Sequence, residues 1–324
     1  MQKIDISSQS NIIDKKILYY VKIFLLCLIT FFFSKLLLFY QTGGDQIGYR
    51  ALYDELASSD INEIIPLAYI HIGGAEPVSV FFLWLGAVIG INKDIYISLL
   101  NVLLVCLLYL TALRNKVSPL MTVLLLLNFY IIVLMVSAER LKISYIFLLF
   151  AANTKGNAKK LFLLISVFAH FQTLILMLSL ILDKLFKIKL NKISPIKIIF
   201  GILFLLPIFL YLFNSFFQDM FYKFSAYKSS FPISEFLNIF LLIASSILVI
   251  KEKFKFIIVL SPILLSIYFL GGTRVNMIAV TFVLYHLIEE KKISNILIYP
   301  LMMYLVIKSF WYINLIVKYG DGFI

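Results

Sequence analysis

Runs of roughly twenty apolar residues follow one another along this chain, and a helix of that length can cross the hydrocarbon layer of a bilayer. The runs fill most of the 324 residues, of which 62% are hydrophobic and only 14% are charged. The polar stretches between them do not exceed about 40 residues, which is too short for a soluble domain. The sequence therefore predicts an all-α, polytopic transmembrane helical bundle over residues 1–324, with about 9–12 membrane helices, some of them short or re-entrant.

The formal charge is +12, but the basic residues lie in short loops between apolar runs. That pattern is an orientation signal, so nucleic acid is not an expected partner. The basic loops are the N-terminal tail, the loop at Arg114, and residues 155–160, 184–192, 251–255 and 291–292. Placing these in the cytoplasm gives a cytoplasmic N-terminus, with Ile17–Phe39 as the first span.

All the basic loops can lie in the cytoplasm only if two of the apolar segments are not simple membrane spans. Val78–Ile91 is short for a span, so we expect it to enter without crossing fully. Leu161–Leu182 has basic flanks on both sides, so we expect a hairpin with its apex near His170. The alternative is that both segments span simply. In the favoured topology Asp45, Glu76, Arg140, His170 and Arg274 all fall at or near the outer face.

The external loop at residues 40–77 is predicted to contain an amphipathic helix on the membrane surface. Asp45, Tyr49 and Tyr53 are spaced by four residues, so their side chains share a helix face. The other acidic residues of this loop are explained by exposure to solvent and need no further role. Asp45 directly follows a Gly-Gly pair at the end of the first span, which makes it a candidate functional carboxylate.

Glu76 lies in the motif Gly-Gly-Ala-Glu-Pro, at the beginning of an apolar segment. Pro77 fits the first turn of a helix, and a carboxylate there meets the positive end of the helix dipole. That structural role is one interpretation. The other is catalytic, because carboxylates in or beside a membrane are candidates for function.

Two arginines, Arg140 and Arg274, lie between apolar runs, and a guanidinium grips phosphate through two hydrogen bonds. We therefore consider both as ligands of a lipid pyrophosphate. Snorkelling to head groups is the alternative for each, and an ion pair with Glu139 is a further alternative for Arg140.

His170 lies within an apolar run, where a histidine usually faces a polar interior, and it is a candidate base or hydrogen-bonding group. The histidines and cysteines show no metal-ligand spacing, and no nucleotide-binding motif is present, so no metal and no cofactor is expected. The second external loop, residues 218–234, alternates aromatic and basic residues. Lys223 and Tyr227 could lie along a sugar-phosphate ligand there, or belong to an interfacial aromatic belt.

Four short motifs together resemble the EpsG-like and Wzy-type polysaccharide polymerases over roughly Leu38–Leu180. That family shows an Asp-Tyr element after the first span, a Glu-Pro before an apolar helix, an Arg opening a short helix, and a later Ala-x-x-His element. The corresponding stretches are GGDQIGYRALYDEL, AEPVSVFFLWLGAVIG, ERLKISYIFLLFA and VFAHFQTLIL. This chain has Phe-Ala-His-Phe-Gln-Thr where the family more often has a His-Ser pair, so Gln172 and Thr173 after His170 depart from the family pattern.

The resemblance implies a GT-C-like membrane glycosyltransferase. Such an enzyme joins oligosaccharide repeat units carried on undecaprenyl pyrophosphate, at the periplasmic face of the bacterial inner membrane, in O-antigen, capsule or exopolysaccharide synthesis. A chain-length regulator is a candidate partner besides the bilayer. The alternatives from other classes are a flippase for the same lipid-linked sugar and a membrane acyltransferase.

The candidate site residues take two roles in this hypothesis. The residues expected to be catalytic are Asp45, Glu76 and His170. The residues expected to bind substrate are Arg140, Arg274, Tyr49, Tyr53, Lys223 and Tyr227.

Overall fold

The structure is a computed structural model that describes residues 6–74, 76–187, 233–270 and 272–323. Every regular element within those residues is helical, which agrees with the predicted all-α class. Three helices there are long and apolar enough to cross a membrane, or up to five if two bent pairs each count as one span. The helical membrane class is thus supported, with fewer full-length spans in the described residues than the expected number of membrane helices.

The chain is divided into two compact units, of which the second comprises residues 172–301. Its elements are α10 (Thr173–Lys187), α13 (Ile233–Ile247), α14 (Lys253–Leu270), α15 (Gly272–Glu289) and the short 3₁₀ helix η2 (Ile296–Ile298). Lys255 Nζ lies 3.4 Å from Asp183 Oδ1 and links α14 to α10. The residues predicted to be catalytic all belong to the other unit.

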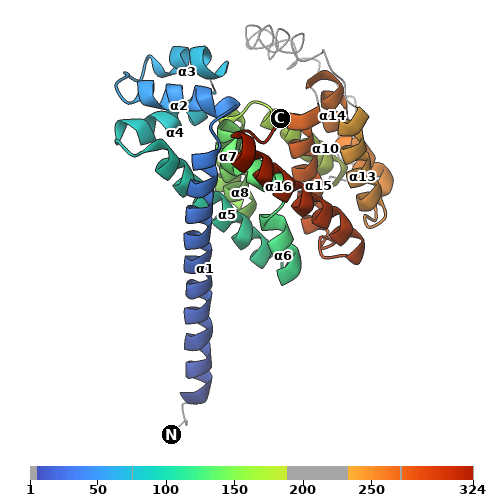
Figure 1. The fold of residues 1–324 in the computed structure, drawn as a ribbon. Helices are drawn as coiled ribbons and strands as arrows, with labels where there is room; N and C mark the ends of the chain where they lie inside the picture. The colour runs from blue at the N-terminus through green and yellow to red at the C-terminus, as the bar shows by residue number, and fades with distance from the viewer. Residues whose placement is uncertain (1–5, 75, 188–232, 271, 324) are drawn as a thin grey trace. The chain divides into compact units, whose positions relative to one another are not determined.

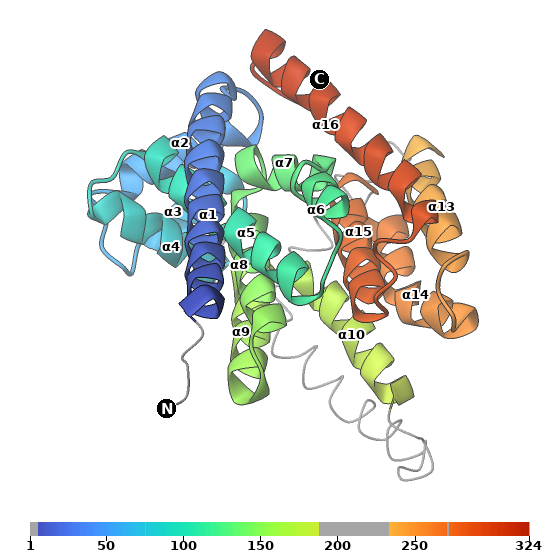
Figure 2. The same cartoon turned by 90° about the horizontal axis from the view of Figure 1, so that it is seen from below.

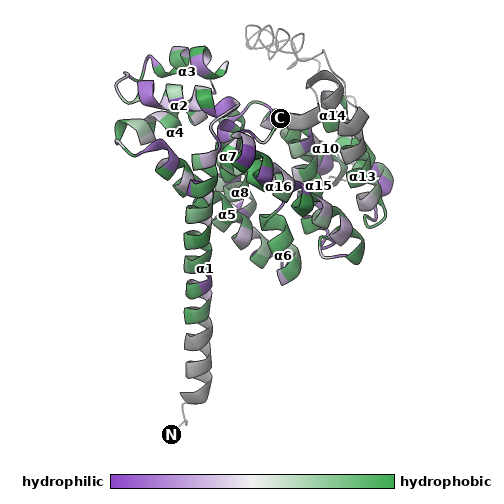
Figure 3. Cartoon of the chain, viewed as in Figure 1, coloured by the Kyte–Doolittle hydropathy of each residue, from purple (hydrophilic) through white to green (hydrophobic). Residues whose placement is uncertain are grey.

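The first unit comprises residues 1–171 and 302–324, and in it α1 packs against α5. Their bounds are Ile6–Tyr40 and Lys93–Arg114. The two helices are antiparallel, because Ser34 Oγ lies 3.2 Å from Ser98 Oγ and, further along, Cys27 Sγ lies 3.3 Å from Cys106 Sγ. The N-terminal part of α1 extends beyond the other helices of this unit (Figure 1). The part of α1 that is long enough to cross a bilayer is predominantly hydrophobic, as a membrane-spanning helix has to be (Figure 3).

Three shorter helices follow the C-terminal end of α1. They are α2 (Asp45–Leu56), α3 (Ile64–Ile72) and α4 (Pro77–Val88). A Cβ on Gly48 would overlap the carbonyl oxygen of His71, so α2 and α3 approach closely because this residue has no side chain. The axes of α3 and α4 differ by 100°. The segment Val78–Ile91, which we expect not to cross the membrane fully, corresponds to the short helix α4. This helix forms a bent pair with α3.

The apolar run at residues 119–138 forms two helices with a break between them. These are α6 (Pro119–Leu126) and α7 (Phe129–Val136), and their axes differ by 41°. The side chain of Asn128 accepts hydrogen bonds from the backbone N–H groups of Tyr130 and Ile131. This side chain caps the N-terminus of α7, which is why a second helix begins there.

The next two helices, α8 (Glu139–Asn153) and α9 (Gly156–Ala169), form an antiparallel pair. Arg114 donates to the carbonyl oxygen of Asn153, which places the α8–α9 junction at the C-terminal end of α5. Ser144 Oγ donates to the Ser166 carbonyl oxygen at 2.8 Å, so α9 returns along α8. The backbone of His170 is extended (φ −158°, ψ 115°), and α9 stops before it. The helix is therefore interrupted at His170, but the expected hairpin over Leu161–Leu182 stays a prediction, because α10 belongs to the second unit.

The two ends of the first unit differ in charge. One end, which we call the basic end, holds Arg114, Lys116 and residues 155–160. The other, which we call the α2 end, holds α2, the starts of α5 and α8, and the end of α9. Figure 2 shows α2, α3 and α4 on one side of α1, with α5, α8 and α9 on the other.

The last residues of the chain also lie at the α2 end. The helix α16 (Tyr299–Tyr319) precedes them, and the backbone N–H groups of Thr42 and Gly43 donate to the Gly320 carbonyl oxygen at 3.0 and 2.8 Å. Gly44 has φ 58°, and a Cβ on it would lie 2.8 Å from Asp321 Oδ2. The two glycines that precede Asp45 thus give room for the C-terminal tail.

Candidate functional site

Three ionisable side chains from separate parts of the sequence meet at the α2 end. Arg140 Nη1 donates to Glu76 Oε2 at 2.5 Å, and His170 Nδ1 lies 3.0 Å from Glu76 Oε1. The exposed fractions of the Arg140, Glu76 and His170 side chains are 13%, 9% and 11%. We call these residues the Arg140–Glu76–His170 cluster. Burying charged groups is costly even when they are paired, so such a cluster is a candidate for function as well as for stability.

The backbone around Glu76 explains the Gly-Gly-Ala-Glu-Pro motif. Pro77 is the first residue of α4, and Glu76 before it is extended (φ −68°, ψ 115°), as an N-cap residue is. A Cβ on Gly74 would overlap Arg140 Nη1. The glycine therefore makes room for the guanidinium, and the proline begins the helix that presents the carboxylate to it.

The charge state of Glu76 follows from its neighbours. Glu76 itself lies outside the three helices that are long and apolar enough to cross a membrane. Burial alone would raise the pKa of Glu76, but its hydrogen bond with His170 and the charges of His170 and Arg140 hold that pKa below its ordinary range. An ionised carboxylate only accepts hydrogen bonds, so Nδ1 of His170 carries the proton of this contact. In the neutral ring Nε2 is then the basic nitrogen.

The guanidinium of Arg140 has further partners. Its Nε donates to Tyr49 Oη at 3.2 Å, and its Nη2 donates to the Ile72 carbonyl oxygen at 3.5 Å. Tyr49 lies on the buried face of α2. The contacts within the described residues use three of the five N–H donors of the guanidinium.

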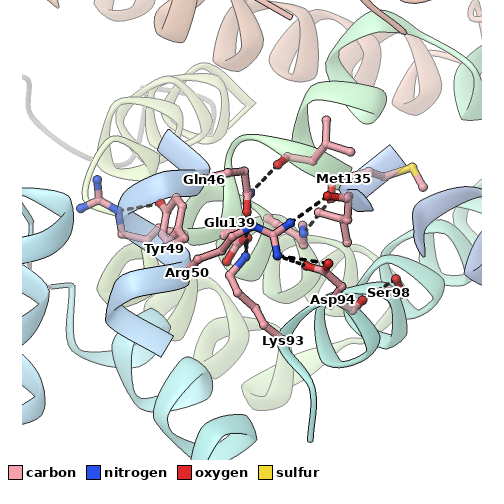
Figure 4. Close-up of polar contacts among 12 residues, drawn as sticks. Gln46, Tyr49, Arg50, Lys93, Asp94, Ser98, Met135 and Glu139 are labelled. Carbon is pink, nitrogen blue, oxygen red and sulfur yellow. Dashed lines mark hydrogen bonds and ion pairs between the residues drawn. The ribbon is translucent and has the colours of Figure 1, made fainter. Parts of the chain in front are cut away.

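A second, fully buried cluster lies next to the first, and its members are Gln46, Lys93 and Glu139. Lys93 Nζ donates to Glu139 Oε1 and to Gln46 Oε1, both at 2.7 Å, and Gln46 Nε2 donates to Glu139 Oε1 at 2.8 Å. Figure 4 shows these three side chains pointing toward one another from α2, α5 and α8. Glu139 directly precedes Arg140, so this cluster anchors the start of the helix that carries the guanidinium.

The second cluster was not anticipated from the sequence. The sequence allows an ion pair between Glu139 and Arg140, whereas the structure pairs Glu139 with Lys93. In the sequence Lys93 lies in Asn-Lys-Asp, which has the composition of an ordinary polar loop. The one sequence signal was the position of Lys93 on the predicted outer side. Basic residues are expected to be few there, so a lysine on that side suggests an acidic partner.

Of the other predicted residues, Tyr49 contacts the Arg140–Glu76–His170 cluster through Arg140. Asp45 is exposed in the first turn of α2, whereas Tyr49 and Tyr53 are buried, so the three do not present one common surface. Tyr53 Oη donates to the Ile91 carbonyl oxygen at 3.0 Å, away from the Arg140–Glu76–His170 cluster. Arg274 lies in α15 of the second unit. Lys223 and Tyr227 lie outside the described residues.

Among the residues that the structure describes, no three His, Cys, Asp or Glu side chains form a group that could hold a metal ion. No protein-family model, curated protein or solved structure matches this chain.

Proposed function

We propose that this chain is a membrane glycosyltransferase that polymerises oligosaccharide repeat units carried on undecaprenyl pyrophosphate. The observation that carries the proposal is the meeting of Arg140, Glu76 and His170, from three distant segments, in one largely buried cluster. The cluster combines a cation suited to a pyrophosphate with a carboxylate–imidazole pair suited to moving a proton. The motif resemblance of these same segments to EpsG-like and Wzy-type polymerases supports the same reaction.

In the proposed reaction, His170 takes the proton of an acceptor sugar hydroxyl at Nε2. The hydroxyl oxygen forms a bond to the anomeric carbon of the donor sugar. The bond from that carbon to the pyrophosphate oxygen breaks, and the pyrophosphate leaves with the bonding electrons on the lipid. Arg140 stabilises the negative charge that develops on the leaving group.

Glu76 has an orienting role in this mechanism. As a carboxylate with a lowered pKa it is a weak base, but it holds His170 in the tautomer whose Nε2 is basic. This assigns the proton transfer to the histidine, with Asp45 at the exposed start of α2 as the alternative carboxylate.

The charge of the two ends of the first unit supports one orientation in the membrane. The basic end corresponds to the cytoplasm under the positive-inside rule, so the α2 end with its cluster would face the periplasm of a bacterial inner membrane. That is the side on which exported lipid-linked sugars are available, and the lipid pyrophosphate supplies the leaving group without ATP.

Deleting the gene in its own host and running the surface polysaccharide on a gel tests the proposal. A polymerase predicts single repeat units on the lipid core in place of a ladder, with the ladder restored by the wild-type gene. Loss of even the single unit would instead indicate a flippase. A ladder of unchanged length with altered decoration would indicate an acyltransferase.

A further inference from the structure

An open apolar groove of about 480 Å³ lies between α3, α4, α8 and α9. Its lining is entirely hydrophobic and includes Ile64, Pro77, Phe81, Phe82, Phe147 and Ile165. The volume falls within the roughly 300–1,000 Å³ of typical ligand sites, but such sites normally include a few polar groups. A groove with none suits a hydrocarbon chain.

The groove is lined by residues that lie close in sequence to the Arg140–Glu76–His170 cluster. Pro77 follows Glu76 directly. Phe147 comes seven residues after Arg140 on α8, which is about 10 Å along a helix. Ile165 comes five residues before His170, about 8 Å along α9. On both α8 and α9, therefore, the groove lies on the side of the cluster that faces the basic end.

This arrangement matches a lipid with an anionic head and a long apolar tail. The head would lie at the guanidinium, near the surface, and the tail would run along the helices toward the bilayer interior. Inside a bilayer the lipid chain is already out of water, so the groove adds affinity through packing contacts along the chain, which a free pyrophosphate does not have.

We propose that the groove binds the first isoprene units of the lipid whose pyrophosphate lies at Arg140. The inference rests on the proposed function, because that function supplies the isoprenoid pyrophosphate as leaving group. It adds that the enzyme recognises its substrate by the lipid chain as well as by the sugar and the phosphates.

The test measures binding to the purified full-length protein in detergent, by native mass spectrometry. The probes are undecaprenyl pyrophosphate, inorganic pyrophosphate and phosphatidylglycerol. The variant Ile165→Trp fills the groove, and Val78→Trp fills it from α4 if the first variant does not accumulate. The matched control is Leu164→Trp, because Leu164 is the preceding residue on α9, is 56% exposed and does not line the groove.

We expect Ile165→Trp to weaken undecaprenyl pyrophosphate binding roughly tenfold, because the larger side chain takes the place of the lipid chain and removes its packing contacts. Inorganic pyrophosphate should bind this variant as it binds the wild type, and Leu164→Trp should leave both affinities unchanged. Wild-type affinity in both groove-filling variants would overturn the inference. So would equal binding of phosphatidylglycerol, which would make the groove an ordinary lipid site.

Arg140→Ala separates this inference from the proposed function. If undecaprenyl pyrophosphate binding falls in Ile165→Trp but not in Arg140→Ala, the groove holds the chain and the pyrophosphate assignment fails. If binding falls in Arg140→Ala alone, the pyrophosphate assignment stands and the groove proposal fails.

Discussion

Single residues of the Arg140–Glu76–His170 cluster have two possible roles, a stabilising ion pair and a reactive group. The two roles differ in what a hydrophobic replacement does. A buried ion pair can often be exchanged for apolar side chains with little loss of stability, whereas removing one partner leaves an uncompensated charge. A reactive group cannot be exchanged for a hydrocarbon without loss of the reaction.

Glu76→Leu alone should lower the free energy of unfolding by about 3–5 kcal/mol, because Arg140 and His170 then lack their carboxylate. The double variant Glu76→Leu, Arg140→Met should recover most of that stability but produce no polymer. Thermal unfolding in detergent and a polysaccharide gel report the two properties. A ladder in the stable double variant would reduce the cluster to a structural role.

Different sequence signals indicate the members of this cluster. These signals predict the side of the membrane on which the residues lie, but not their contacts. Glu76 was found through the proline that follows it, and His170 through its position in an apolar run. Their contact distances depend on how α3, α4, α8 and α9 pack, which no local pattern encodes. Tyr53 shows the limit, since its spacing from Tyr49 is helical but its hydroxyl lies near Ile91.

At the scale of elements, close approaches between helices and loops set the position of the guanidinium. Gly73 and Gly74 are neighbours with different roles. Gly73 has φ 58° and no atom within 4 Å of an added Cβ, whereas a Cβ on Gly74 would overlap Arg140 Nη1. The first glycine is needed for the turn that ends α3, and the second for the site.

Gly74→Ala should therefore displace Arg140 and shorten or abolish the polymer. Gly73→Ala should cost about 1 kcal/mol of stability for its left-handed backbone and leave the polymer length unchanged. Comparing the two strains on one gel, with the amount of membrane protein equalised by immunoblot, checks this. Equal ladders would show that the space at Gly74 does not matter for activity.

The buried cluster of Gln46, Lys93 and Glu139 connects α2, α5 and α8, so its loss should lower the free energy of unfolding. Lys93→Met removes the ion-pair partner of the buried Glu139, which then keeps the hydrogen bond from Gln46 and the nearby charge of Lys142, and should destabilise by about 3–5 kcal/mol. Arg50→Met is the control at the same end, because the Arg50–Asp94 pair is partly exposed and its loss should cost below about 1 kcal/mol. Unfolding midpoints in detergent measure both, and similar values would contradict the assigned burial.

At the scale of the whole first unit, charge and helix direction agree. The antiparallel pairs α1 with α5 and α8 with α9 bring the predicted external carboxylates to one end and the basic loops to the other. The charge pattern was sufficient to predict this separation, because each loop carries its own signal. It was not sufficient for Lys93, whose charge is satisfied internally and therefore says nothing about orientation.

Cysteine labelling tests the orientation. In a protein whose Cys27 and Cys106 are replaced by alanine, Asp45→Cys should react with a membrane-impermeant maleimide in intact spheroplasts. Lys159→Cys, at the basic end, should react only after permeabilisation. Both positions are exposed or half-exposed, so access is decided by the membrane. The opposite pattern would place the cluster in the cytoplasm and remove the periplasmic reaction.

The central claim is that Arg140 serves the reaction and not merely the fold, and the length distribution of the surface polysaccharide measures it most directly. Arg140→Ala should give single repeat units while the protein remains in the membrane. Arg50→Ala, which removes an arginine at the same end from a partly exposed ion pair, should give the wild-type ladder. A full ladder in the Arg140→Ala strain would contradict the account.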